Sequence, residues 1–220
     1  MPGTTVQIGP VLGWLELIGI AVFAASGALT ASRKQMDLGG FIVIATVTAI
    51  GGGTVRDLLL GAKPVYWVTE PVYPLVCAAV AVALFFAAPL FESRFKALLW
   101  ADAVGLSLFC ATGTEVAISA GAPWIAAVVL GVITSTFGGI IRDVLCNEVP
   151  LILRREIYAT AALLGAAIYA ALRYAGFDLP IATLAAFTAC FTVRAVAIAF
   201  SLSLPVYGHR PGRSYNDPPR

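Results

Sequence analysis

The chain has 220 residues, of which 60% are hydrophobic and 12% are charged, and its formal net charge is +2. The charged fraction is about half that of an ordinary soluble domain, and the mean hydropathy of +0.90 indicates an integral membrane protein. The small net charge, with cations scattered in pairs, excludes a nucleic-acid-binding class. The four cysteines lack metal-binding spacing and the only histidine lies near the C-terminus. We therefore expect no metal site, no cofactor and no enzyme activity.

Seven apolar stretches are long enough to cross a bilayer, for which about 20 residues are needed. In chain order these stretches are residues 11–31, 38–61, 71–91, 97–118, 123–147, 157–174 and 179–204. The first is predicted to be a retained span, because no basic segment and cleavage site mark it as a signal peptide. We expect an all-α integral membrane protein with one seven-helix domain over residues 1–204. The polar segment 205–220 is predicted to be a disordered tail.

Lysine and arginine are distributed unevenly among the predicted loops. Nine of them lie in one set of alternate loops and the tail, while the other side holds only Lys63 and Arg173. Positively charged loops stay in the cytoplasm. We therefore predict a multi-pass protein of the cell (inner) membrane, with its N-terminus outside and its C-terminus in the cytoplasm. Three further cations, Arg56, Arg142 and Arg194, fall within the spans.

The chain contains an internal repeat: a shift of 86 positions aligns repeat one, residues 11–92, with repeat two, residues 97–175, without a gap up to the third span. Glycines, prolines and charged residues match, and Glu16 corresponds to Asp102. Each repeat has three spans, so the second enters the membrane from the opposite side, as in many transport proteins. We predict two inverted three-helix repeats and a seventh helix at 179–204. The alternative is a duplication that only built a stable bundle with close-packed glycines.

The motif Gly-Gly-x-x-Arg-Asp occurs once in each repeat, in the second span and in the fifth. Each copy interrupts a long apolar run, and glycine weakens a helix by up to about 1 kcal/mol. We expect kinked or unwound second and fifth helices, whose half-helix ends meet at the midplane. Freed backbone groups would then face water or protein, since lipid cannot bond them. The residues concerned are Gly51, Gly52, Gly53, Arg56 and Asp57 in the first copy, and Gly138, Gly139, Arg142 and Asp143 in the second.

Charged side chains in mid-membrane cost several kcal/mol when unpaired, so these residues are expected to be paired or to face a wet pore. Neighbouring residues point about 100° apart on a helix, which favours partners on other helices. The arginine of one repeat could thus bind the aspartate of the other. An ion-pair network that locks the glycine positions is an equal alternative to pore lining. Glu16, Asp102 and Arg194 are predicted to line a cation path or to balance charge, and Arg194 could balance one of the motif aspartates.

With seven spans, an external N-terminus, inverted repeats and this doubled motif, the chain resembles the prokaryotic members of the trimeric intracellular cation (TRIC) channel family. The resemblance covers residues 11–204. It implies a homotrimer with a separate pore in each subunit, lined partly by the second and fifth helices. Its expected partners are monovalent cations such as potassium, membrane lipids and further copies of the chain.

Bacterial relatives in this family are also described as glycine-transporter-domain membrane proteins. The alternative function is therefore a secondary transporter of glycine or a similar small zwitterion, whose carboxylate would bind at half-helix N-termini. The arginines bear on this choice, because an unpaired cation repels cations. In a channel we expect Arg56 and Arg142 to be paired or to act as gates.

Overall fold

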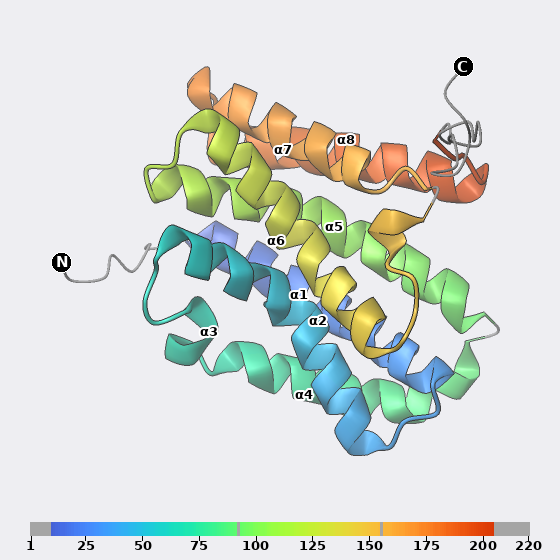
Figure 1. Ribbon diagram of the computed structural model, residues 1–220. Coiled ribbons are helices and arrows are strands. Elements are labelled where there is room, and N and C mark those ends of the chain that lie inside the picture. The colour runs from blue at the N-terminus through green and yellow to red at the C-terminus, as the bar shows by residue number, and fades with distance from the viewer. Residues whose placement is uncertain (1–9, 92, 155, 205–220) are drawn as a thin grey trace, which may run out of the picture.

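The computed structural model describes residues 10–91, 93–154 and 156–204, which form a bundle of helices (Figure 1). The predicted tail at 205–220 lies outside these residues. The long helices are α1 (Pro10–Arg33), α2 (Leu38–Leu60), α4 (Val72–Ala87), α5 (Arg94–Ser119), α6 (Trp124–Leu145), α7 (Ala159–Tyr174) and α8 (Leu179–Ala199). The short segments are α3 (Tyr66–Thr69), η1 (Ala88–Leu90) and η2 (Leu151–Leu153). The all-helical prediction is confirmed.

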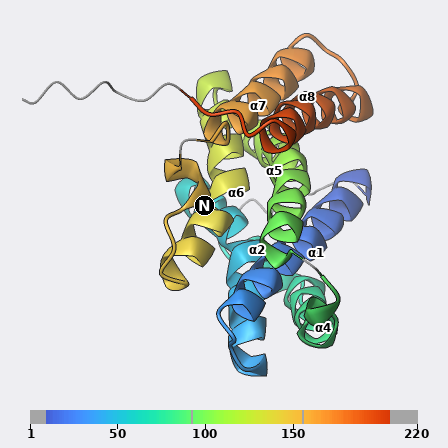
Figure 2. The same ribbon diagram turned by 90° about the vertical axis from the view of Figure 1, so that its right-hand side faces the viewer.

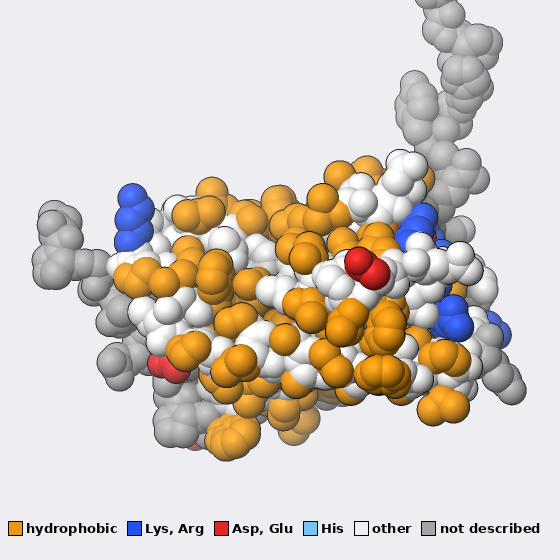
Figure 3. Space-filling view, turned by 90° about the horizontal axis from the view of Figure 1, so that it is seen from below, with side chains coloured by type: hydrophobic (Ala, Val, Ile, Leu, Met, Phe, Trp, Pro, Cys, Tyr) orange, Lys and Arg blue, Asp and Glu red, His pale blue; other side chains and the backbone are white. Residues whose placement is uncertain are grey.

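Six of these helices are long and apolar enough to cross a membrane. The exception is α7, whose 16 residues span about 24 Å at 1.5 Å per residue, less than a hydrocarbon core of about 30 Å. Hydrophobic side chains cover most of the face in Figure 3, and lysine and arginine lie toward its two ends. The chain is therefore a multi-pass membrane protein. The crossing at residues 157–174 stays a prediction.

Helix ends follow from local sequence signals. The Asp37 carboxylate accepts a hydrogen bond from the Gly40 N–H at 2.8 Å, which satisfies a free donor at the start of α2. The same helix ends at Gly61, whose φ of 71° is left-handed and suits glycine. Ser93 caps α5 in the same way as Asp37 caps α2, so α5 begins three residues before the predicted position. The last helix, α8, ends at Ala199, five residues earlier than predicted.

The helices follow one another in layers across the molecule. In Figure 1, α4 lies at one edge, α1 and α2 come next, and α5 and α6 follow. The opposite edge is formed by α7 and α8, which pack on each other and on α5. Figure 2 shows α1 crossing α5 in the middle of the bundle. Contacts of α1 with α5 and of α2 with α6 therefore hold the two halves together.

The crossing of α1 with α5 is built from two exchanged contacts between glycine and phenylalanine. A Cβ atom on Gly19 would lie 3.1 Å from the Phe109 ring, and one on Gly105 would overlap the Phe23 ring. The two rings lie 5.2 Å apart between centroids. Positions 19 and 105, like positions 23 and 109, differ by 86. The residues that form this contact are therefore related by the same offset of 86 positions as the two sequence repeats.

Candidate functional site: two buried charge clusters beside a glycine crossing

The motif glycines lie where α2 crosses α6. A Cβ atom on Gly52 would overlap the carbonyl oxygen of Thr134, and one on Gly138 would overlap the carbonyl oxygen of Thr48. A Cβ atom on Gly51 would lie 3.7 Å from the Cα atom of Gly138. Backbones can approach this closely only where no side chain separates them. The glycines are thus required for the contact between the two helices.

Of the two expected forms, a kink or an unwound turn at these glycines, the unwound turn is wrong. Both α2 and α6 are continuous helices through the motif, from Leu38 to Leu60 and from Trp124 to Leu145. Half-helix ends therefore do not meet at the midplane. In lipid an unwound turn would leave backbone groups without partners, whereas packed glycines keep the helical hydrogen bonds and still admit a close neighbour. A bend that preserves the helix stays a prediction.

Of the other two motif glycines, Gly53 faces a tyrosine ring and Gly139 faces charged side chains. A Cβ atom on Gly53 would lie 2.8 Å from a ring carbon of Tyr66. One on Gly139 would lie 3.2 Å from the Tyr158 hydroxyl and 3.5 Å from Oδ1 of Asp102. A side chain at either position would press on polar groups in the interior.

The first charge cluster consists of Glu16, Arg56, Asp57, Tyr66 and Tyr73. Arg56 donates to Oδ1 of Asp57 from Nε at 2.9 Å and from Nη2 at 2.8 Å, and its Nη1 lies 3.7 Å from Oε1 of Glu16. The backbone N–H of Tyr66 donates to the second Asp57 oxygen at 2.9 Å. The Tyr73 hydroxyl donates to Oε2 of Glu16 at 3.3 Å. Residues from α1, α2, α3 and α4 are joined in this way.

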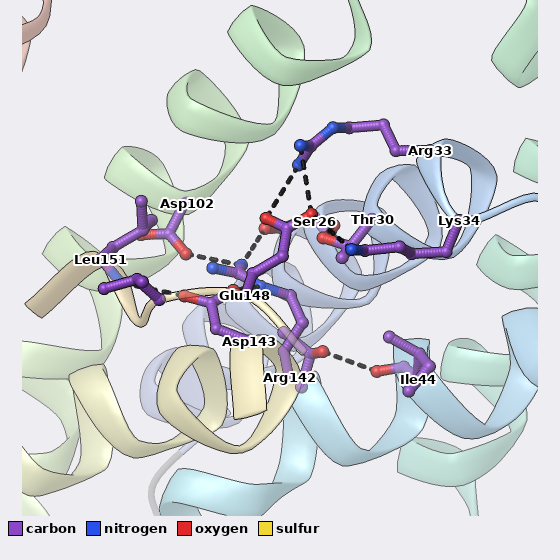
Figure 4. A network of polar contacts seen from close by, with 12 residues as sticks. Ser26, Thr30, Arg33, Lys34, Ile44, Asp102, Arg142, Asp143, Glu148 and Leu151 are labelled. Carbon is purple, nitrogen blue, oxygen red and sulfur yellow. Dashed lines mark hydrogen bonds and ion pairs between the residues drawn. The ribbon is translucent and has the colours of Figure 1, made fainter. Parts of the chain in front are cut away.

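The second charge cluster consists of Ser26, Asp102, Arg142, Asp143 and Leu151, which Figure 4 shows turned toward one another. Arg142 donates from Nε to Oδ1 of Asp143 at 2.7 Å. Its Nη1 donates to Oδ1 of Asp102 at 2.8 Å and to the Ser26 hydroxyl at 2.5 Å. The backbone N–H of Leu151 donates to the second Asp143 oxygen at 2.9 Å. This cluster joins α1, α5, α6 and η2.

The two clusters have the same construction. In each, an arginine binds the aspartate that follows it and an acid on the first helix of its own repeat. The expected pairing of one repeat's arginine with the other's aspartate is therefore wrong, because the arginine side chain is long enough to fold back onto its neighbour. The prediction that both arginines are paired is confirmed. The charged residues that correspond at a shift of 86 are Glu16 and Asp102, Arg56 and Arg142, and Asp57 and Asp143.

Both clusters are buried and contain more acid than base. The arginine side chains are at most 1% exposed and the carboxylates at most 6%. Two carboxylates surround each guanidinium, so each cluster has a formal charge of −1 when its acids are ionised. Within the described chain, Arg56 Nη1, Arg142 Nη2 and Asp102 Oδ2 have no hydrogen-bond partner. Unbalanced charge away from water is costly, so a proton or a cation must balance it.

Arg194 lies outside both clusters. Its Nη2 donates to Oε2 of Glu156 at 2.9 Å, and its Nη1 donates to the carbonyl of Ile157 at 3.1 Å. The guanidinium carbon lies 5.0 Å from the centre of the Tyr158 ring. The prediction that Arg194 balances a motif aspartate is therefore wrong. Its partner is Glu156, on the segment that leads into α7.

Sequence reasoning missed the tyrosines of the site. Tyr73 is 8% exposed and Tyr158 is 1% exposed, and Arg56 lies 5.4 Å from the centre of the Tyr66 ring. Aromatic residues near span ends are typical of membrane-interface anchors, and this pattern hid their role. One signal was present, because positions 73 and 158 differ by 85, one less than the repeat shift.

An apolar bundle with two matching charge clusters defines a multi-pass membrane protein built around a duplicated polar core. A family model described as "Glycine transporter" matches residues 13–89 and 99–174. Each of the two matched segments contains one copy of the motif. Together with the solved structures described next, this match shows that the chain belongs to the TRIC channel family.

Several relatives match most of the chain. The UPF0126 inner membrane protein YadS of Escherichia coli is 42% identical over 199 residues, covering 88% of this chain and 95% of the relative. A UPF0126 membrane protein of Vibrio cholerae is 41% identical, covering 88% and 81%. A crystal structure of the TRIC trimeric intracellular cation channel orthologue from Rhodobacter sphaeroides is 52% identical, with a TM-score of 0.85 and coverage of 87% and 99%. A second structure, described under conductance through TRIC cation channels, is 37% identical with a TM-score of 0.82 and coverage of 91% and 98%.

Proposed function

We propose that the chain is a potassium-permeable channel for monovalent cations, with a pore in each subunit of a homotrimer. The solved structures to which it is similar are described as cation channels. Their identity to this chain, 52% and 37% over most of its length, supports a shared activity. In the same proposal the chain lies in the inner membrane with its N-terminus outside, and its two three-helix repeats are inverted. The bias of cations toward one set of loops supports that orientation.

The observation that carries this proposal is the excess of acid in both charge clusters. A guanidinium held by two carboxylates does not present a free positive charge to a passing ion. When both acids are ionised, the remaining negative charge lies in a low-dielectric interior, where it attracts cations more strongly than it would in water. Glu16 and Asp102 are the acids that convert a balanced arginine–aspartate pair into a negative site.

The threonine hydroxyls next to the glycine crossing face α1 and α5, where Cβ atoms on Gly27 and Gly113 would lie 2.7 and 2.6 Å from them. Thr48 donates to the Ile44 carbonyl and Thr134 donates to the Leu130 carbonyl, both at 2.6 Å. Because each hydroxyl hydrogen is already used, only oxygen lone pairs remain, and these suit a cation. The crossing is packed too tightly to admit an ion. We infer that conduction requires α2 and α6 to separate there, with the charge clusters holding their ends.

Single-channel recording of the purified protein in planar bilayers tests the proposal. We expect discrete potassium currents without added substrate. Glu16→Gln should lower the unitary current, whereas Glu70→Gln, which removes an exposed acid, should leave it unchanged. Both variants need a monodisperse elution profile before they are compared. Glycine-dependent uptake into liposomes with no unitary current would contradict the channel and favour the transporter.

A further inference from the structure

We propose that three cations at one end of the bundle form a binding site for the headgroup phosphate of an anionic phospholipid. Arg33 ends α1, Lys34 follows it, and Arg154 lies directly after η2. All three surround the carboxylate of Glu148, on the loop between α6 and η2. Figure 4 shows Arg33 and Lys34 turned toward this carboxylate. This site lies apart from the glycine crossing and does not depend on the channel proposal.

A single carboxylate holds the cations in place. Oε1 of Glu148 lies 3.1 Å from Nη2 of Arg33 and 3.3 Å from Nζ of Lys34. Oε2 lies 3.2 Å from Nη1 of Arg33 and 3.6 Å from Nη2 of Arg154. Three positive charges against one negative charge leave a surplus of +2. Both carboxylate oxygens are fully engaged, so Glu148 fixes the group without neutralising it.

Donors remain available on the cations. Lys34 directs one of its three N–H bonds to Glu148. Arg154 uses Nε for the Val149 carbonyl at 3.0 Å, and its Nη1 contacts no acceptor within the described chain. The side chains of Arg33, Lys34 and Arg154 are 28%, 34% and 27% exposed. These half-buried, pre-positioned donors match a phosphate, which accepts several charge-assisted hydrogen bonds.

Apolar surface borders the same cations, as a phospholipid requires. Arg33 and Arg154 both contact the Phe95 ring, with guanidinium carbons 4.8 and 5.5 Å from its centre. Leu153, next to Arg154, is 73% exposed. A charged group beside an exposed aliphatic side chain suits a molecule with a phosphate and acyl chains better than a free ion.

The site can be tested by native mass spectrometry of the full chain released from neutral detergent. Wild-type protein is titrated with phosphatidylglycerol and, separately, with phosphatidylcholine of the same acyl chains. We expect a clear preference for phosphatidylglycerol. Each cation removed should weaken its binding about fivefold, so Lys34→Gln together with Arg154→Gln should lower it about 25-fold. Lys63→Gln, which removes an exposed cation elsewhere on the chain, is the matched control and should have no effect.

Two further arms separate the alternatives. Glu148→Gln adds one net positive charge, so phosphatidylglycerol binding should persist. If this variant folds normally but no longer binds phosphatidylglycerol, the cations serve only to pair with the carboxylate and the lipid site is refuted. Displacement of the lipid by stoichiometric inorganic phosphate would overturn the lipid assignment in favour of a free anion. An unchanged lipid preference in the double variant would overturn the site itself. If the double variant does not fold, the single variant Lys34→Gln tests the site, and phosphatidylglycerol binding should be about fivefold weaker in it than in the wild type.

Discussion

The contact between α2 and α6 predicts that alanine at Gly52 destabilises the fold. Alanine normally stabilises a helix interior by about 1 kcal/mol relative to glycine. Here the new methyl group would overlap the Thr134 carbonyl oxygen, and that backbone group cannot rotate away. Overpacking of this kind costs about 1–3 kcal/mol, or more where the obstacle is rigid. Because the carbonyl is rigid, we expect a cost of about 3 kcal/mol, which after the gain in helix propensity leaves a net loss of about 2 kcal/mol.

The same substitution at Gly13 is the matched control. A Cβ atom there would have no heavy atom within 4 Å, and the residue also lies in a long helix. Thermal unfolding in one detergent should therefore show a lower Tm for Gly52→Ala and an equal or higher Tm for Gly13→Ala. Gly138→Ala should match Gly52→Ala, because it meets the Thr48 carbonyl in the same way. Equal stability of all three variants would refute the packing role and revive a flexible hinge.

Three further predictions concern the polar groups. Asp102→Ala removes the 2.8 Å charge-assisted hydrogen bond that Nη1 of Arg142 donates, while Asp143 still balances the guanidinium, so it should cost about 1.5–3 kcal/mol in chemical unfolding; a loss below about 1 kcal/mol would show that the pair is not coupled. Burial raises the pKa of Glu148, but the neighbouring cations outweigh burial and the net pKa is lowered. Its stabilisation is thus present above the unfolded pKa and lost as pH falls through the folded one. The stability gap to Glu148→Gln should close between about pH 5 and 3; a constant gap contradicts this. Tyr158→Phe should change stability by less than about 0.5 kcal/mol, because its hydroxyl has no partner in the described residues. Tyr169→Phe loses the 3.0 Å hydrogen bond from the Tyr169 hydroxyl to the buried carboxylate of Glu115 and should cost about 1.5–3 kcal/mol. A larger loss of stability for Tyr158→Phe than for Tyr169→Phe would contradict the assigned contacts.

The helices and the position of the polar site were predictable from the sequence. Long apolar stretches with few charges have few alternative structures in lipid, so most boundaries differ by a few residues. The internal repeat pointed to Glu16 and Asp102 as matching acids, and both lie beside an arginine of the motif. A match between polar residues in apolar spans carries information because polar residues are expensive there.

The role of the glycines could not be predicted from the sequence around each glycine alone. Glycine in a span is compatible with a hinge and with close packing, and the choice depends on what lies opposite. For Gly52 that neighbour is the backbone of Thr134, 82 positions later in the chain. The predicted partners of the arginines were wrong for a related reason. Helical angles describe the directions of Cβ atoms and do not describe how far a long side chain reaches. Arg194 bonds Glu156, 38 positions away, and no local pattern joins them.

In the proposed function, the acid-rich buried clusters make this chain conduct cations. The most direct measurement is the reversal potential of the wild-type protein in a bilayer between unequal KCl solutions. We expect unitary currents that reverse close to the equilibrium potential of potassium. Reversal at the equilibrium potential of chloride, or transport of glycine without any unitary current, would contradict it.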